Sequence, residues 1–164
     1  EYSSHINPYL CVHFLYLFIK QMFAGDILNI IEVFNKELKR CSKYGDVPVS
    51  AFITLNGKVI AKAHNTKEKC HNPFNHAEIL AIKKACKKLK RNNLSDCELY
   101  STLEPCNMCK SLINSVKITK AYYLLKKLDY KTDYKTCFIE ISDFQQYKDK
   151  YKQDLHNFFV SLKK

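Results

Sequence analysis

The stretch that decides the fold is residues 49–63, which read VSAFITLNGKVIAKA. Apolar and small or polar residues alternate from Val49 to Leu55, a pattern typical of a half-buried strand. The pair Asn56–Gly57 follows, and it is the strongest short-range signal for a β-hairpin turn. Alternation resumes from Val59 to Ala63. This stretch therefore predicts two antiparallel strands joined by a tight turn.

Helical and strand patterns alternate around this hairpin. Helices are predicted from the N-cap Asp26 to about residue 45, then at about 76–91, about 106–116 and from residue 143 onward. Further strands are predicted at 99–103, 121–125 and 137–141. These patterns indicate an α/β fold with three layers (α/β/α) around a central mixed five-stranded sheet. The last two strands are only about ten residues apart, so the direction of the fifth strand stays open.

Composition limits the class of protein. A chain of 164 residues with 46% hydrophobic residues can bury one ordinary core, so a disordered chain is excluded. Lys+Arg 27 against Asp+Glu 16 gives a net charge of +11, which favours a polyanionic partner such as nucleic acid. Eight cysteines in a chain of this length do not indicate a disulfide scaffold. We expect a reducing compartment, the cytoplasm.

Residues 1–21 stand apart from this pattern. The apolar run at 9–19 is shorter than the roughly 18 residues of a spanning helix, and it lacks the basic region and cleavage site of a secretory signal. We therefore expect no association with a membrane. The first methionine is Met22. Two interpretations stay open: residues 1–21 are an N-terminal extension translated upstream of the true start, or they form a peripheral apolar helix. Residues 22–164 are predicted to form a single domain.

Two short segments carry the chemistry: His76-Ala77-Glu78 and Pro105-Cys106-Asn107-Met108-Cys109. One histidine and two thiolates supply three zinc ligands and leave the fourth tetrahedral position for water, as in catalytic zinc sites. Cys106 and Cys109 are predicted at a helix N-terminus, where the helix dipole favours the thiolate. Glu78 is placed to exchange protons with the water without binding the metal.

Each segment alone has a simpler interpretation. A histidine at a helix start is commonly a cap or a surface residue, and an isolated CxxC can be a redox pair or half of a structural zinc site. Together, H-x-E followed by P-C-x-x-C matches the signature of zinc nucleobase deaminases. His71 and the other six cysteines have no matching spacing and are predicted to be loop, core or surface residues.

Four stretches extend the match: Val47-Pro48-Val49, Ala63-His64-Asn65, residues 75–79 (NHAEI) and residues 99–109 (LYSTLEPCNMC). Through them, the sequence from Asp46 to about Leu125 resembles the bacterial tRNA-specific adenosine deaminase (TadA) family, within the cytidine deaminase-like superfamily. This resemblance covers about half of the chain. It departs from the family after the fourth strand, where Asp129-Tyr130-Lys131 replaces a longer, glycine-containing segment that bears on RNA.

The resemblance implies a zinc hydrolase that deaminates adenosine to inosine at the wobble position of a tRNA anticodon. One Zn²⁺ per subunit would be held by His76, Cys106 and Cys109, with Glu78 as the catalytic proton carrier. Asn65 would hydrogen-bond the inserted nucleotide, and the backbone of Ala77 would line the pocket. Asn65 can also be understood as a turn residue that closes the hairpin.

The resemblance also implies partners: the anticodon stem-loop of a tRNA, and a second copy of the chain in a homodimer. Two alternatives stay open. A deaminase of the same fold can act on a free base or nucleoside of the guanine or cytosine type. A non-catalytic RNA-binding zinc protein can keep the fold, although a purely structural zinc site has no need of Glu78.

Overall fold

The structure, a computed structural model, describes residues 30–41, 44–126 and 136–162. The chain falls into two compact units, Glu1–Val33 and Phe34–Lys164. Only residues 30–33 of the first unit are described, and they are helical. The predicted extension at 1–21 and the predicted domain start at residue 22 lie outside the described residues. Within the described ranges, no helix is long and apolar enough to cross a membrane.

A five-stranded mixed sheet forms the centre of the second unit. Its strands are β1 (Ser50–Leu55), β2 (Lys58–His64), β3 (Cys97–Leu103), β4 (Lys120–Leu125) and β5 (Cys137–Glu140), in the order β2-β1-β3-β4-β5. β1 is antiparallel to β2 and to β3, whereas β4 is parallel to β3 and to β5. The predicted sheet is confirmed, and the direction of the fifth strand, which the sequence left open, is parallel.

The predicted hairpin turn is present between β1 and β2. Asn56 and Gly57 both have positive φ, 50° and 73°. A two-residue turn of the type that matches the twist of paired strands needs positive φ at both positions, which asparagine and glycine tolerate best. Leu55 and Lys58 pair directly across it. The turn therefore sets the pairing next to it, and an irregularity between Ile53 and Thr54 shifts the register further along the two strands.

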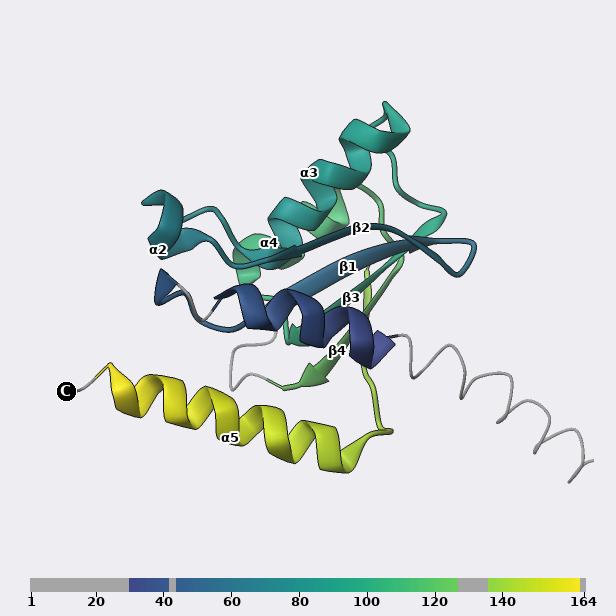
Figure 1. The fold of residues 1–164 in the computed structure, drawn as a ribbon. Coiled ribbons are helices and arrows are strands. Elements are labelled where there is room, and N and C mark those ends of the chain that lie inside the picture. The colour runs from purple at the N-terminus through teal and green to yellow at the C-terminus, as the bar shows by residue number, and fades with distance from the viewer. Residues whose placement is uncertain (1–29, 42–43, 127–135, 163–164) are drawn as a thin grey trace, which may run out of the picture. The chain divides into compact units, whose positions relative to one another are not determined.

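Helices cover both faces of the sheet, which confirms the three-layer prediction. They comprise residues 34–41 (helix 34–41 below), α2 (Lys67–Cys70), α3 (Ala77–Leu89), α4 (Asn107–Ser115) and α5 (Gln145–Ser161). α3 and α4 lie on one face, and helix 34–41 and α5 on the other (Figure 1). On this second face the rings of Phe34, Phe52, Tyr100 and Tyr122 form a row with neighbouring centroids 4.8–5.0 Å apart.

The buried face of α3 differs from the predicted one. Helical periodicity over residues 76–91 predicts that Ile79, Leu80, Ile82, Cys86 and Leu89 point inward. Ile82 is buried, but the other four are only half-buried and flank the core. The remaining buried apolar positions are alanines: Ala77, Ala81 and Ala85. Periodicity marks large apolar residues, whereas a helix that packs closely on strands needs small ones along its line of contact.

Three helix starts also differ from the predicted ones. His76 and Cys106 are N-caps with extended backbone, so α3 and α4 begin one residue later than expected. α5 begins at Gln145, after Phe144 with φ 76°. The four-residue α2, for which His71 is the C-cap, was not predicted at all. The departure from the family pattern at residues 129–131 lies outside the described residues.

Tyr151 fastens α5 to the rest of this unit. Its ring is 2% exposed, and its O–H donates to the carbonyl of Pro48 over 2.7 Å. The hydroxyl of Thr102 on β3 donates to the Tyr151 hydroxyl oxygen over 3.0 Å. Because Pro48 lies two residues before the start of β1, these bonds connect α5 to the end of the sheet where the candidate site lies.

Candidate metal centre and active site

The predicted ligands lie where α3 and α4 begin. β3 ends at Leu103, and two residues, Glu104 and Pro105, connect it to Cys106, the N-cap of α4. His76 is the N-cap of α3. Both caps accept the first helical hydrogen bond through their carbonyls, from Leu80 N–H (3.0 Å) and Lys110 N–H (2.8 Å). The regular backbone of two helix starts therefore fixes the positions of both side chains.

The three predicted ligand atoms have the spacing of a zinc tetrahedron. Nδ1 of His76 lies 3.7 Å from Sγ of Cys106 and 3.6 Å from Sγ of Cys109, and the two sulfurs are 3.6 Å apart. Zinc bonds of about 2.3 Å to sulfur and 2.0 Å to nitrogen would separate sulfur from sulfur by about 3.8 Å and sulfur from nitrogen by about 3.5 Å. The group can hold a metal ion, and its donor set fits zinc.

A hydrogen bond of 3.6 Å between the sulfurs links the two thiols. Hydrogen bonds with Cys109 and with His76 lower the pKa of the Cys106 thiol to about 3, although the sulfur is partly buried. The pKa of the Cys109 thiol is raised by the same thiol–thiol bond and by burial. The hydrogen bond with Cys106 raises the pKa of His76. One thiolate is thus already favoured, and a bound dication would ionise the second thiol.

Glu78 lies in the first turn of α3, two residues after the candidate ligand His76. Its side chain is 4% exposed and faces the same pocket as His76 and Cys106. Burial raises the pKa of the Glu78 carboxyl to about 7, since the charged form loses its hydration. A carboxyl group with a pKa near neutrality can both accept and release a proton under physiological conditions.

Asn65 links the end of β2 to the start of α3. Its Oδ1 accepts from the N–H of Ala77 over 2.9 Å, and its Nδ2 donates to the carbonyl of Val47 over 3.0 Å. Asn65 lines the pocket, and Ala77 is fully buried. Asn65 is therefore more than a turn residue that closes the hairpin. Its predicted bond to a nucleotide, and the predicted contact of the Ala77 backbone, remain predictions.

We expect Asn65→Ala to destabilise the protein by about 1–3 kcal/mol, because the buried Ala77 N–H loses its side-chain acceptor. The Val47 carbonyl loses one of two donors and keeps the Val49 N–H. Urea unfolding followed by circular dichroism measures this loss. Asn93→Ala is the matched control, since Asn93 is exposed and bonds only the nearby Ser95 N–H. If Asn65→Ala lowers the free energy of unfolding no more than this control does, the hydrogen bonds of Asn65 do not stabilise the protein.

The pocket encloses about 250 Å³ and brings together four predicted site residues: Asn65, His76, Glu78 and Cys106. Cys109 is buried beside them. Sequence reasoning missed three further lining residues, Lys67, Glu104 and Phe159. Glu104 stands within the motif at 99–109 and had a local signal. Lys67 on α2 and Phe159 near the end of α5 come from elements whose position only the tertiary structure fixes.

A buried ion pair borders the pocket. Lys110 Nζ lies 2.7 Å from Glu104 Oε1, and both side chains are at most 12% exposed. The Lys110 ammonium also lies 5.3 Å from the ring centroid of Phe138 on β5. The pair neutralises the Glu104 carboxylate beside the metal centre, which leaves Glu78 as the carboxyl group available for proton transfer.

A comparison with protein families decides the class of this centre. The family described as the cytidine and deoxycytidylate deaminase zinc-binding region matches residues 26–125. The chain belongs to this deaminase family. The match covers helix 34–41, all the candidate site residues named above except Phe159, and the sheet through β4. The predicted cytidine deaminase-like fold is confirmed.

Relatives within the deaminase family fall into more than one activity class. Over 93 residues the chain is 45% identical to a tRNA-specific adenosine deaminase of Aquifex aeolicus, with 57% of this chain and 62% of that protein covered. Over 82 residues it is 38% identical to a guanine deaminase of Bacillus subtilis, with 50% of this chain and 53% of that protein covered. The chain thus spans little more than half of the length of these curated relatives.

The solved structures agree on the fold. One structure comes from a study of A-to-I editing by tRNA:A34 deaminases at the wobble position of transfer RNA. It has a TM-score of 0.63 and 26% identity, and the alignment covers 70% of this chain and 98% of that one.

Proposed function

We propose that this protein is a zinc-dependent hydrolase that converts adenosine to inosine at the wobble position of a tRNA anticodon. The observation that carries the proposal is the pocket in which His76, Cys106 and Cys109 have zinc-ligand spacing and Glu78 is buried beside them. His76, Cys106 and Cys109 would hold one Zn²⁺ per subunit. The resemblance to tRNA-specific adenosine deaminases supports the choice of substrate.

The chemistry divides between the metal and Glu78. When bound, zinc would supply a Lewis acid that makes water nucleophilic at neutral pH, for attack on C6 of adenine. Glu78 would take one proton from that water and transfer it to the ring nitrogen N1. It would then carry the second proton, from the new C6 hydroxyl, to the departing amine. Burial excludes bulk water from its carboxyl group. Hydrolysis consumes one water and releases one ammonia, so no further cofactor is needed.

Charge supports an RNA substrate over a free base. The chain carries a net charge of +11, and Lys67 lines the pocket. Binding of an uncharged purine base requires neither the positive net charge nor a lysine at the pocket. Both features increase the affinity for a polynucleotide, because its phosphates are negatively charged. The 38% identity to a guanine deaminase favours the second candidate function, deamination of guanine or another free base. A substrate panel of anticodon stem-loop, guanine, cytidine and deoxycytidylate separates the candidates by product.

We expect binding of an anticodon stem-loop to depend strongly on salt. Lysines that contact phosphates displace condensed counterions, so affinity should fall about tenfold or more between roughly 50 and 200 mM salt. Fluorescence anisotropy with a labelled stem-loop measures the slope, and guanine serves as the uncharged reference ligand. An affinity for the stem-loop that stays constant over this range would count against an RNA substrate.

The proposal includes assembly as a homodimer and action in the cytoplasm, as the resemblance implies. Neither follows from the pocket itself. Sedimentation of the zinc-loaded protein at micromolar concentration would detect the dimer as a doubled mass.

A further inference from the structure

A groove lies between helix 34–41 and α5 on the second face of the sheet. It encloses about 480 Å³, close to twice the volume of the pocket with Glu78. Asn35, Leu38 and Lys39 line one side, and their spacing of three and four places them on one face of their helix. Lining residues on α5 recur at the same spacing, from Lys150 to Ser161. Two facing helical surfaces therefore form the groove.

The groove and the pocket share a wall. Val47 and Val49 line the pocket, whereas Pro48 between them lines the groove. A tight turn, closed by a 2.8 Å bond from Val49 N–H to the Val47 carbonyl, accounts for this division. On α5, Phe159 lines the pocket and Phe158 lines the groove. A chain that leaves the pocket over this wall enters the groove directly.

Hydrogen bonds hold the groove in place at both ends. Near the pocket, two hydrogen bonds hold the shared wall. Asn65 donates to the Val47 carbonyl, and Tyr151 donates to the Pro48 carbonyl. At the other end, the O–H of Tyr147 donates to Oδ1 of Asn35 over 3.0 Å and joins the two helices. From Tyr147 to Phe158, α5 advances about 16 Å. The groove is thus a fixed, extended depression that begins beside the active site.

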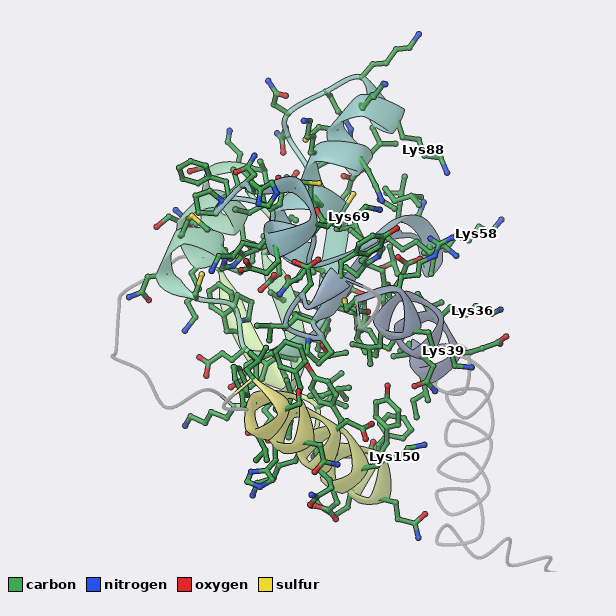
Figure 2. All side chains as sticks on the ribbon, turned by 60° about the vertical axis from the view of Figure 1, so that its left-hand side comes forward. Lys36, Lys39, Lys58, Lys69, Lys88 and Lys150 are labelled. Carbon is green, nitrogen blue, oxygen red and sulfur yellow. The ribbon has the colours of Figure 1, made fainter. Side chains whose placement is uncertain are left out.

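The chemistry of the lining suits a nucleic-acid strand. Lys39 on helix 34–41 and Lys150 on α5 lie on the same side of the molecule (Figure 2). Among the described residues that line the groove, Asp154 is the only carboxylate against Lys39 and Lys150, so this lining is net positive. Phe158 offers an aromatic ring and Asn157 an amide. Ammonium groups for phosphates and an aromatic ring for a base are the recurring parts of single-strand binding sites.

The size of the pocket makes a second site necessary. Ligand pockets for drug-sized molecules span about 300–1,000 Å³, and this one, at about 250 Å³, is smaller. It can enclose one nucleobase but not the neighbouring nucleotides. We propose that the groove binds the phosphodiester backbone of the nucleotides next to the target adenosine, with Lys39 and Lys150 on phosphates. This inference rests on the proposed RNA substrate.

The test combines lysine variants with altered phosphates. Lys39→Gln and Lys150→Gln remove one charge from each side of the groove. Lys36→Gln and Lys152→Gln are matched controls on the same two helices, because neither residue lines the groove. Affinity for an anticodon stem-loop and the rate of inosine formation at saturation are measured for each variant. The same is done with stem-loops that carry one uncharged methylphosphonate link on either side of the target.

Each groove variant is expected to weaken stem-loop binding about threefold to tenfold and to lower the salt slope by about one, with the saturated rate unchanged. The loss should vanish on the stem-loop whose methylphosphonate replaces the contacted phosphate. If all four lysine variants weaken binding equally, or no methylphosphonate abolishes the loss, the groove is not the site. Wild-type protein that makes no inosine would instead refute the proposed function.

Discussion

Glu78→Gln is expected to reduce the rate of inosine formation about a thousandfold while the zinc content stays at one ion per chain. Glutamine keeps the shape of the buried side chain but cannot carry a proton, and general acid–base catalysis contributes about 10²–10⁴ in rate. Zinc should stay bound because the metal-binding group comprises His76, Cys106 and Cys109. Single-turnover assays on a stem-loop, with elemental analysis of the same samples, measure both quantities.

The control for this change is Glu98→Gln. Glu98 lies at the start of β3, at the opposite end of that strand from the metal centre, and its side chain is partly exposed. Its replacement should leave both rate and zinc content near the wild-type values. Loss of zinc from Glu78→Gln would make Glu78 a ligand, and an unchanged rate would remove its role in proton transfer.

Cys106→Ser is expected to abolish zinc binding and activity together. Cys106 supplies the thiolate that its neighbours favour most strongly, and a serine hydroxyl does not ionise at neutral pH. Loss of partners outside the ligand shell weakens metal binding about 10–100-fold, so loss of a ligand should cost at least a hundredfold. Competition with a chromogenic chelator measures the affinity directly.

Cys70→Ser is the matched control, since Cys70 is an exposed free thiol at the end of α2. It should bind zinc as tightly as the wild type. The account would be contradicted if Cys106→Ser retained wild-type affinity, or if zinc removal by a chelator left deamination unaffected. Re-addition of zinc to the chelator-treated wild type should restore the rate of deamination. The same addition should not restore activity to Cys106→Ser.

The sequence predicted best those features that depend on a few neighbouring residues, either through backbone conformation or through the residue types that a metal site requires. Asn56–Gly57 predicted the hairpin because few residue pairs accept two positive φ values. H-x-E and P-C-x-x-C predicted the metal centre because a zinc site allows few residue types. Residues thirty positions apart, His76 and Cys106, meet within 3.7 Å as this pattern required.

Features set by tertiary contacts were not predictable in this way. α2 is only four residues long, and its first N–H groups are held by the distant carboxylate of Asp46, with Glu68 N–H at 2.7 Å. No periodicity can signal so short a helix. Phe159 reaches the pocket only because Tyr151 fastens α5 to Pro48. The alanine face of α3 likewise depends on how closely the helix packs on β1 and β2.

The most direct test of the proposed function is mass spectrometry of nucleosides released from an anticodon stem-loop after incubation with the zinc-loaded protein. The stem-loop carries adenosine at the wobble position and at one other loop position, and guanine and cytidine are supplied in parallel reactions. The account predicts inosine at the wobble position alone. Turnover of guanine or cytidine, with the stem-loop unchanged, would contradict it.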